Sequence, residues 1–206
     1  MSEIAIIDYG VGNLRSLEKA FAACGANAQV SDDLRELGQA RALVLPGVGA
    51  FAACMKALGE RGFDQFVLER VAAGIPLLGV CVGMQMLFDE SEEFGRTRGL
   101  SLLRGQVLRF TSDLPVPHVG WNQVHQTRAH PLLTGIEDDS FFYFVHSYYC
   151  DAVEADTVLG ETEYSIKYAS MVVRERVAGV QFHPEKSQAA GLKLLYNFAR
   201  FAMICG

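Results

Sequence analysis

This chain of 206 residues lacks a secretory segment, a membrane-length apolar run and an excess of basic residues. No basic segment leads into an apolar secretory region, and no uncharged apolar run reaches the roughly 18 residues of a membrane helix. Basic residues are also few, since 18 lysines and arginines face 24 aspartates and glutamates, for a net charge of −6. Because nucleic-acid surfaces need clustered basic residues, this balance argues against a broad one. We expect a soluble, cytoplasmic protein.

Paired cysteines are missing too. The odd, scattered set of five contains no CxxC pair: Cys24, Cys54, Cys81, Cys150 and Cys205. Neither a disulfide framework nor a zinc site is therefore indicated. We expect reduced thiols, no metal and no cofactor.

A dinucleotide fingerprint is present only in part. Gly10 and Gly12 follow the first apolar strand, but the third glycine position is Arg15. No acidic residue closes an evident second strand, and a lone G-x-G is a weak signal without that context. Nucleotide binding is not expected.

Apolar strands alternate with helix-period segments over residues 4–88. The expected strands are 4–7, 28–30, 42–45 and the run from Ile75 to Cys81, and the expected helices are 14–24, 51–58 and 63–73. Residues 89–93, Asp-Glu-Ser-Glu-Glu, are typical of a solvated helix end. This alternation predicts a parallel, doubly wound sheet whose ligands bind beyond the carboxyl ends of its strands.

Shorter strands follow from Gly99 onward. They are expected at 106–110, 119–124, 140–149, 165–168, 171–174 and 178–182, before an amphipathic closing helix over 188–203. The apolar run 141–145 reads as a buried strand. Since no low-complexity linker separates the halves, we predict one domain of residues 1–206. Its fold class is α/β, with a mostly parallel sheet, flanking helices and a β-rich C-terminal half.

A nucleophile elbow is the strongest local signal. In Gly79-Val80-Cys81-Val82-Gly83, an apolar strand runs into a helix-prone segment, and each glycine stands two residues from the cysteine. Glycines there allow a tight turn without Cβ clashes, and the sulfur comes to lie at the first turn of a helix, which favours a thiolate. The alternative is a small, buried, inert cysteine.

His183-Pro184-Glu185 offers the partners that a cysteine nucleophile needs. It follows the apolar strand 178–182, so His183 ends a strand and Glu185 can turn back toward the imidazole. The other histidines have no carboxylate two residues away at a strand end. Nucleophile, base and orienting group would then be Cys81, His183 and Glu185.

A second glycine-bearing corner, Pro46-Gly47-Val48-Gly49, ends the strand over 42–45. Its N–H groups and that of Val82 would form an oxyanion hole, whose donors stabilise the charge that develops on a carbonyl oxygen. An ordinary turn is the alternative reading.

Taken together, these motifs resemble the class I, triad-type glutamine amidotransferases over nearly the whole chain. The resemblance is closest to the histidine-biosynthesis branch, through the segments 8–14 (DYGVGNL), 46–51 (PGVGAF), 117–122 (PHVGWN) and 145–148 (VHSY). It implies glutamine hydrolysis to glutamate and ammonia through a γ-glutamyl thioester on Cys81. It also carries oxyanion roles to Val48, Gly49 and Val82, and glutamine recognition to Gly49, Gln85, Glu93, His146, Ser147 and Tyr148.

The same resemblance implies a partner. Glutaminases of this branch dock on a separate cyclase subunit, a (β/α)₈ barrel, and pass ammonia to it, and no barrel-length segment exists in this chain. Interface or gate candidates are Asn13, Trp121, Tyr143 and Lys186; solvated surface is the alternative for the two polar residues and core packing for the two aromatics. Where other branches have Pro-Gly-Gly, the sequence has Pro-Gly-Val-Gly, which makes Val48 a gating candidate.

Two other functions stay open at this point. One is a triad glutaminase that serves another synthase, such as those of anthranilate, purine or pyridoxal synthesis. The other is a non-catalytic interaction subunit with the same fold. The second is disfavoured because all three triad roles are filled.

Overall fold

Four parallel strands begin the fold of the computed structural model, which describes residues 3–111 and 113–204. They pair in the order β2-β1-β3-β4 and are β1 (Ile4–Ile7), β2 (Ala28–Ser31), β3 (Ala42–Gly47) and β4 (Leu77–Cys81). Every residue of β1, β3 and β4 is buried, as expected of parallel strands covered on both faces.

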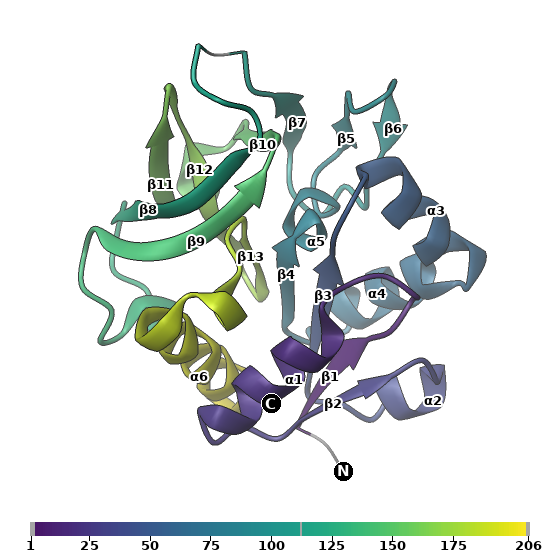
Figure 1. Cartoon of the computed structure of the whole chain (residues 1–206). Coiled ribbons are helices and arrows are strands. Elements are labelled where there is room, and N and C mark those ends of the chain that lie inside the picture. The colour runs from purple at the N-terminus through teal and green to yellow at the C-terminus, as the bar shows by residue number, and fades with distance from the viewer. Residues whose placement is uncertain (1–2, 112, 205–206) are drawn as a thin grey trace.

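Helices cover this sheet on both sides (Figure 1). On one side α1 (Leu14–Ala23) contacts α6 (Gln188–Ile204), and on the other α3 (Phe51–Glu60) packs on α4 (Phe63–Ala72). The one-turn helix α2 (Leu34–Leu37) was not predicted. Its signal is the Asp33 cap, whose side chain accepts a hydrogen bond from the Arg35 N–H at 2.7 Å. The predicted doubly wound α/β fold is confirmed.

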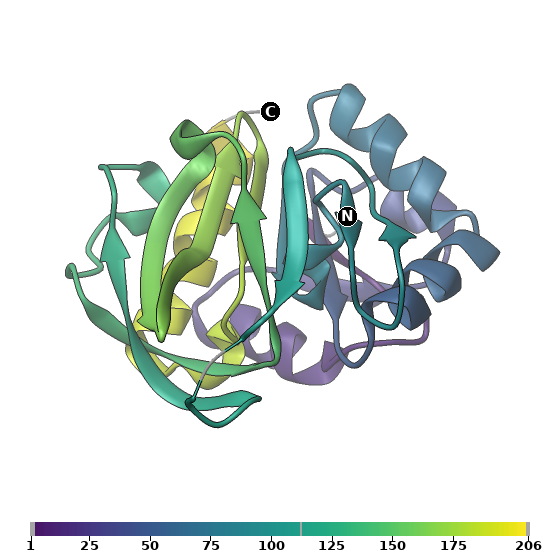
Figure 2. The same cartoon turned by 90° about the horizontal axis from the view of Figure 1, so that it is seen from above.

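The C-terminal half continues the same sheet. β13 (Val177–Val180) pairs in parallel with β4, and β12 (Ile166–Arg174) pairs antiparallel with β13. The order then runs β12-β10-β7-β5-β6, through β10 (Tyr148–Ala152), β7 (Gly105–Arg109), β5 (Glu90–Ser91) and β6 (Thr97–Arg98). Figure 2 shows β10 and β12, in green and yellow-green, on one side of the molecule and α3 and α4, in blue, on the other, with the teal strands β7, β5 and β6 between them.

An outer layer of strands branches from β12. β11 (Val158–Tyr164) pairs with β12 and with β8 (His118–Gln126), which in turn pairs with β9 (Ser140–His146). Three short 3₁₀ turns, η1 (Pro131–Leu133), η2 (Ala155–Thr157) and η3 (Pro184–Lys186), complete the elements. The η3 turn holds Glu185 directly after β13.

Several sequence predictions were wrong in detail. The expected strand 140–149 is broken at Ser147 into β9 and β10, whereas 165–168 and 171–174 are parts of the single strand β12. Strands β5, β6 and β11 were missed. Residues 89–93 are not a helix end, because β5 pairs in parallel with β7 and buries Ser91.

The run 141–145 was predicted to be a buried strand, and it is buried on one side only. Phe142 and Phe144 are buried, whereas Phe141 and Val145 are exposed, which is the alternation of a strand with one solvent-facing side. Composition alone hid this pattern, because the exposed positions are as apolar as the buried ones.

The described cysteines, Cys24, Cys54, Cys81 and Cys150, are free thiols, and Cys205 lies outside the described residues. In the part of the chain that the structure describes, we find no helix with the length and apolar character needed to cross a membrane.

The elbow glycines are required by close packing rather than by unusual dihedral angles. A Cβ on Gly83 would lie 1.9 Å from the Leu45 carbonyl oxygen, and one on Gly79 would lie 2.6 Å from the Gly83 oxygen. These neighbours are backbone atoms of β3 and the elbow, so they cannot rotate away.

We therefore expect Gly83→Ala to lower the free energy of unfolding by about 1–3 kcal/mol, the usual cost of overpacking. The matched control is Gly59→Ala in α3, where an added Cβ meets nothing closer than 3.7 Å. That change should be neutral or stabilising, because alanine favours a helix. Urea unfolding of both variants measures the difference, and equal stabilities would contradict this packing explanation.

Candidate active site

Cys81 stands at the corner between β4 and the single helical turn α5 (Val82–Gln85). Its backbone has φ 57° and ψ −115°, a conformation that L-residues rarely adopt and that marks a strained turn. The predicted elbow is therefore present. The helix after it is shorter than expected, so its dipole contributes little at the sulfur.

His183 and Glu185 meet as the sequence predicted. Nδ1–H of His183 donates to Oε1 of Glu185 at 3.0 Å, and the Glu185 side chain is 1% exposed. The proline after His183 starts η3, which turns the carboxylate back toward the ring. Asn13 lies behind the pair and donates from Nδ2 to the same Oε1 at 3.4 Å.

These contacts determine the charge on the imidazole. Burial lowers the pKa of His183, but its hydrogen bonds to the Cys81 sulfur and to Glu185 outweigh this and raise it to about 10. A protonated imidazole beside the sulfur favours the thiolate. Its raised pKa lets the imidazole stay protonated at neutral pH.

A cavity of about 390 Å³ opens on this pair. The predicted residues that line it are Val48, Gly49, Cys81, Val82, Gln85, Glu93, His146, Ser147, Tyr148, His183 and Lys186. They come from β3, the elbow, the β5 region, the β9–β10 junction and η3, so the carboxyl ends of the parallel strands do form the site. Glu185 lies behind His183, outside the lining.

Gln181 belongs to the site and was not predicted. Its Nε2 donates toward the Cys81 sulfur at 3.9 Å, and its Oε1 accepts from Nε2 of Gln85 at 3.0 Å. Gln85 also donates to the Tyr148 carbonyl at 3.1 Å. A signal existed in the sequence, since Gln181 is the polar residue within the apolar strand that leads to His183.

His146 closes the floor of the cavity as a neutral ring. It is buried, which lowers its pKa to about 3, and its Nδ1–H donates to the Tyr148 carbonyl at 2.7 Å. His118 lies beneath it with 3.2 Å between His118 Nδ1 and His146 Nε2, and burial lowers the pKa of His118 to about 4. Both rings are therefore neutral, and His146 bridges the bend between β9 and β10 through its bond to the Tyr148 carbonyl.

The family comparison agrees with this geometry. The sequence profile described as "Glutamine amidotransferase class-I" matches residues 5–201. The chain belongs to the class I glutamine amidotransferase family.

Curated members of this family resemble the amidotransferase chain over nearly its full length. This chain is 48% identical over 198 residues to "Imidazole glycerol phosphate synthase subunit HisH" of Desulfitobacterium hafniense strain Y51, and the match covers 96% of this chain and 94% of the relative. The subunit of the same name from Salinibacter ruber is 50% identical over 201 residues, covering 94% and 92%. That of Moorella thermoacetica is 47% identical over 206 residues, covering 100% and 98%.

Solved structures share the fold of this chain at low sequence identity. "Crystal structure of glutamine amidotransferase" superposes with a TM-score of 0.78 at 21% identity, covering 98% of this chain and 99% of that one. "Structure of PurLQS from Thermotoga maritima" gives 0.77 at 17% identity, with the same coverage.

The interface candidates of this amidotransferase chain lie in two different environments. Trp121 and Tyr143 face each other across β8 and β9, with ring centroids 5.9 Å apart, and Trp121 is exposed rather than packed in the core. The Lys186 ammonium lies 5.8 Å from the Tyr143 ring centroid. Asn13 is half-buried against Glu185, so its place in the structure is beside the acid–base pair rather than on solvated surface.

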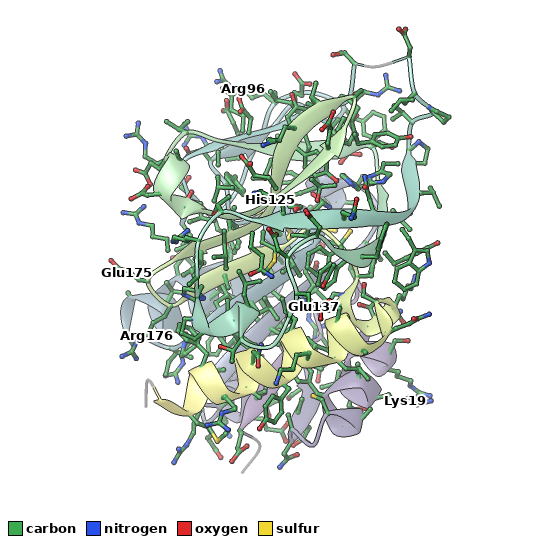
Figure 3. The ribbon with its side chains drawn as sticks, turned by 90° about the vertical axis from the view of Figure 1, so that its left-hand side faces the viewer. Lys19, Arg96, His125, Glu137, Glu175 and Arg176 are labelled. Atoms are coloured by element: carbon green, nitrogen blue, oxygen red, sulfur yellow. The ribbon has the colours of Figure 1, made fainter. Side chains whose placement is uncertain are left out.

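One cluster of a histidine and two aspartates lies away from the cavity. His125 is on β8, on the side shown in Figure 3, with its Nδ1 3.1 Å from Asp138 and 3.4 Å from Asp139. Within the described residues this is the group with metal-ligand spacing, but all three side chains are exposed and pair with one another. We assign no role to it.

Proposed function

We propose that this chain is the glutaminase subunit of imidazole glycerol phosphate synthase and acts in histidine biosynthesis as a single cytoplasmic domain, residues 1–206. It would hydrolyse L-glutamine and deliver the ammonia to a separate cyclase. The observation that supports this most is the Cys81–His183–Glu185 arrangement at the mouth of the cavity, in a chain 47–50% identical to HisH subunits.

The first half-reaction forms a thioester. The Cys81 thiolate attacks the side-chain carboxamide carbon of glutamine, and the carbonyl oxygen becomes an oxyanion that accepts hydrogen bonds from backbone N–H groups of Val82 and of Val48 or Gly49. When the intermediate collapses, the C–N bond breaks and protonated His183 gives its proton to the departing nitrogen. Ammonia leaves and the γ-glutamyl group stays on the sulfur.

The second half-reaction hydrolyses the thioester. His183, now neutral, takes a proton from water, and the resulting hydroxide attacks the thioester carbon. The C–S bond breaks, glutamate leaves, and the thiolate–imidazolium pair is restored. Glu185 orients the ring throughout by accepting the hydrogen bond from Nδ1–H, and Asn13 holds the carboxylate.

Polar groups around the cavity would recognise the amino-acid end of glutamine. Glu93 carries negative charge at the lining and suits the α-ammonium group, while Ser147 and the backbone near Tyr148 offer hydrogen-bonding groups. Gln85 uses both of its N–H bonds on Tyr148 and Gln181, so its Oε1 is the side-chain atom left for the substrate.

The cyclase would dock on the outward side of β8 and β9. Exposed Val119 pairs with exposed Val145 across these strands, and exposed Trp121 pairs with half-buried Tyr143. This surface borders the cavity, which Val145 and Lys186 also line. We propose a (β/α)₈ barrel as the partner, because a synthase subunit that releases ammonia here needs its acceptor enzyme at the cavity mouth.

The docking surface is joined to the acid–base residue by backbone contacts. The His183 N–H donates to the Tyr143 carbonyl at 2.9 Å, and the Ser187 hydroxyl accepts from the Tyr143 N–H and donates to the His183 carbonyl. A partner seated on Tyr143 can therefore affect the position of His183.

Partner activation is the test of this function. We expect the isolated chain to hydrolyse glutamine slowly, and its kcat to rise about 10²–10³-fold when cyclase and the cyclase substrate are added, the effect of completing an oxyanion hole. Glutamate release measures it. Full activity of the lone chain would contradict the gating role of Val48, and activation by a different synthase, or by none, would contradict the pathway.

The Trp121→Ala variant serves as the docking control in the same assay. Loss of a central aromatic typically weakens association about 10- to 100-fold. Activation should then require more cyclase but reach the same kcat at saturation. An unchanged cyclase requirement would place the docking surface elsewhere.

A further inference from the structure

Two buried side chains outside the Cys–His–Glu arrangement hold the loop Pro46-Gly47-Val48-Gly49. The Tyr9 hydroxyl, at the end of β1, donates to the Pro46 carbonyl at 2.6 Å. The Cys54 thiol, in the first turn of α3, donates to the Val48 carbonyl at 3.3 Å. The carbonyls of Pro46 and Val48 thus accept hydrogen bonds from side chains outside the loop.

Both donors are built into the core. Tyr9 is 2% exposed and Cys54 is fully buried. Burial raises the pKa of each group, so both keep the proton that they donate. The two side chains also lie close to each other, which brings the end of β1 and α3 together beneath the loop.

Fixing a carbonyl also fixes the N–H of the same peptide unit, because the two point in opposite directions in a trans peptide. With the Val48 oxygen turned to Cys54, the Gly49 N–H points away from α3. Gly49 itself has φ +85°, a conformation that glycine adopts readily. The next part of the loop is held by Glu93, whose Oε2 accepts from the Phe51 N–H at 2.6 Å.

We propose that Tyr9 and Cys54 are positioning residues of the glutaminase reaction: they set the direction of the loop N–H groups that would meet the oxyanion. The proposal rests on the function given above and extends it to two residues that touch neither substrate nor sulfur. Its alternative is core packing alone, in which the hydroxyl and the thiol matter only for stability.

The Tyr9→Phe, Cys54→Ala and Cys54→Ser variants of the full chain, each in complex with the cyclase, distinguish the two. We expect Tyr9→Phe and Cys54→Ala to lower kcat for glutamine hydrolysis about 10- to 100-fold, with KM changed less than about threefold, because misplaced donors weaken transition-state binding alone. Cys54→Ser retains a donor and should recover part of the loss. Tyr164→Phe is the matched control, since that hydroxyl also donates to a prolyl carbonyl, Pro115, at 2.7 Å.

A second readout separates the loop from the nucleophile. Alkylation of Cys81 by iodoacetamide, followed by peptide mass mapping, needs the thiolate but no oxyanion hole, so its rate should match wild type in all variants. Wild-type kcat in Tyr9→Phe and Cys54→Ala, or a loss of alkylation rate equal to the loss of kcat, would overturn the proposal. Failure of the proposed function itself is distinct, since the wild-type complex would then release no glutamate.

Discussion

Replacing Cys81 with alanine is expected to lower glutamine-dependent synthesis by the complex at least about 10⁴-fold while ammonia-dependent synthesis survives. Without the sulfur no thioester forms, and His183 and the oxyanion donors are left with no nucleophile to serve. Under the proposed function, added ammonium salt bypasses this step and supplies the cyclase with ammonia directly. Product formation from each nitrogen source, measured on the same purified complex, gives the ratio directly.

Cys24→Ala is the matched control, because it removes a thiol that is free and half-buried but lies outside the cavity. Both activities should stay at the wild-type level in that variant. If Cys81→Ala lost both activities equally, the sulfur would be a structural element of the complex rather than the attacking group.

The parts of the fold that the sequence predicted are those with local signals. Strands β1, β3 and β4 are continuous apolar runs, and the helices between them have clear periodicity and glycine ends. The short strands β5 and β6 carry no such signal: each has two residues, β5 exists because its backbone pairs with β7, and β6 pairs with β5 in turn. Pairing of this kind is a tertiary effect that no local window contains.

The same division applies to the site. Cys81 and His183-Pro184-Glu185 are short motifs, and the structure brings them together in the arrangement that the motifs suggest. The sequence analysis assigned no positioning role to Tyr9 or Cys54, because that role depends on which carbonyls they reach, 37 and 6 positions away along the chain. Hydrogen bonds to backbone atoms leave almost no trace in residue type.

Glu185→Gln is expected to have the second-largest effect. The variant keeps the shape of the side chain but removes the charge that helps to hold the proton on His183. Burial then lowers the pKa of the imidazole, and the charge of Glu185 no longer offsets that effect. Substituting the orienting carboxylate by its amide in such triads costs about 10⁴ in kcat, and we expect a loss of about 10²–10⁴ here.

The pH dependence tests the cause of that loss. In the wild type the pKa of His183 is raised from 6.5 to about 10, so activity should persist into alkaline solution and fall as the imidazolium loses its proton near pH 10. In Glu185→Gln this alkaline limb should move to lower pH. The pH profile of kcat/KM for glutamine, measured with saturating cyclase, gives the shift, since kcat/KM reports the ionisations of the enzyme without bound glutamine.

Folding stability should show the same linkage. A folded-state pKa above the unfolded value contributes stability that is complete below about pH 6.5 and is lost as pH rises through about 10. Glu185→Gln should flatten this slope, whereas Glu175→Gln, an exposed glutamate in the turn after β12, should leave both the slope and the kinetic limb unchanged. A Glu185→Gln variant with the wild-type alkaline limb would show that the carboxylate orients the ring without holding its proton. The thiolate–imidazolium pair would then depend on Cys81 and His183 alone.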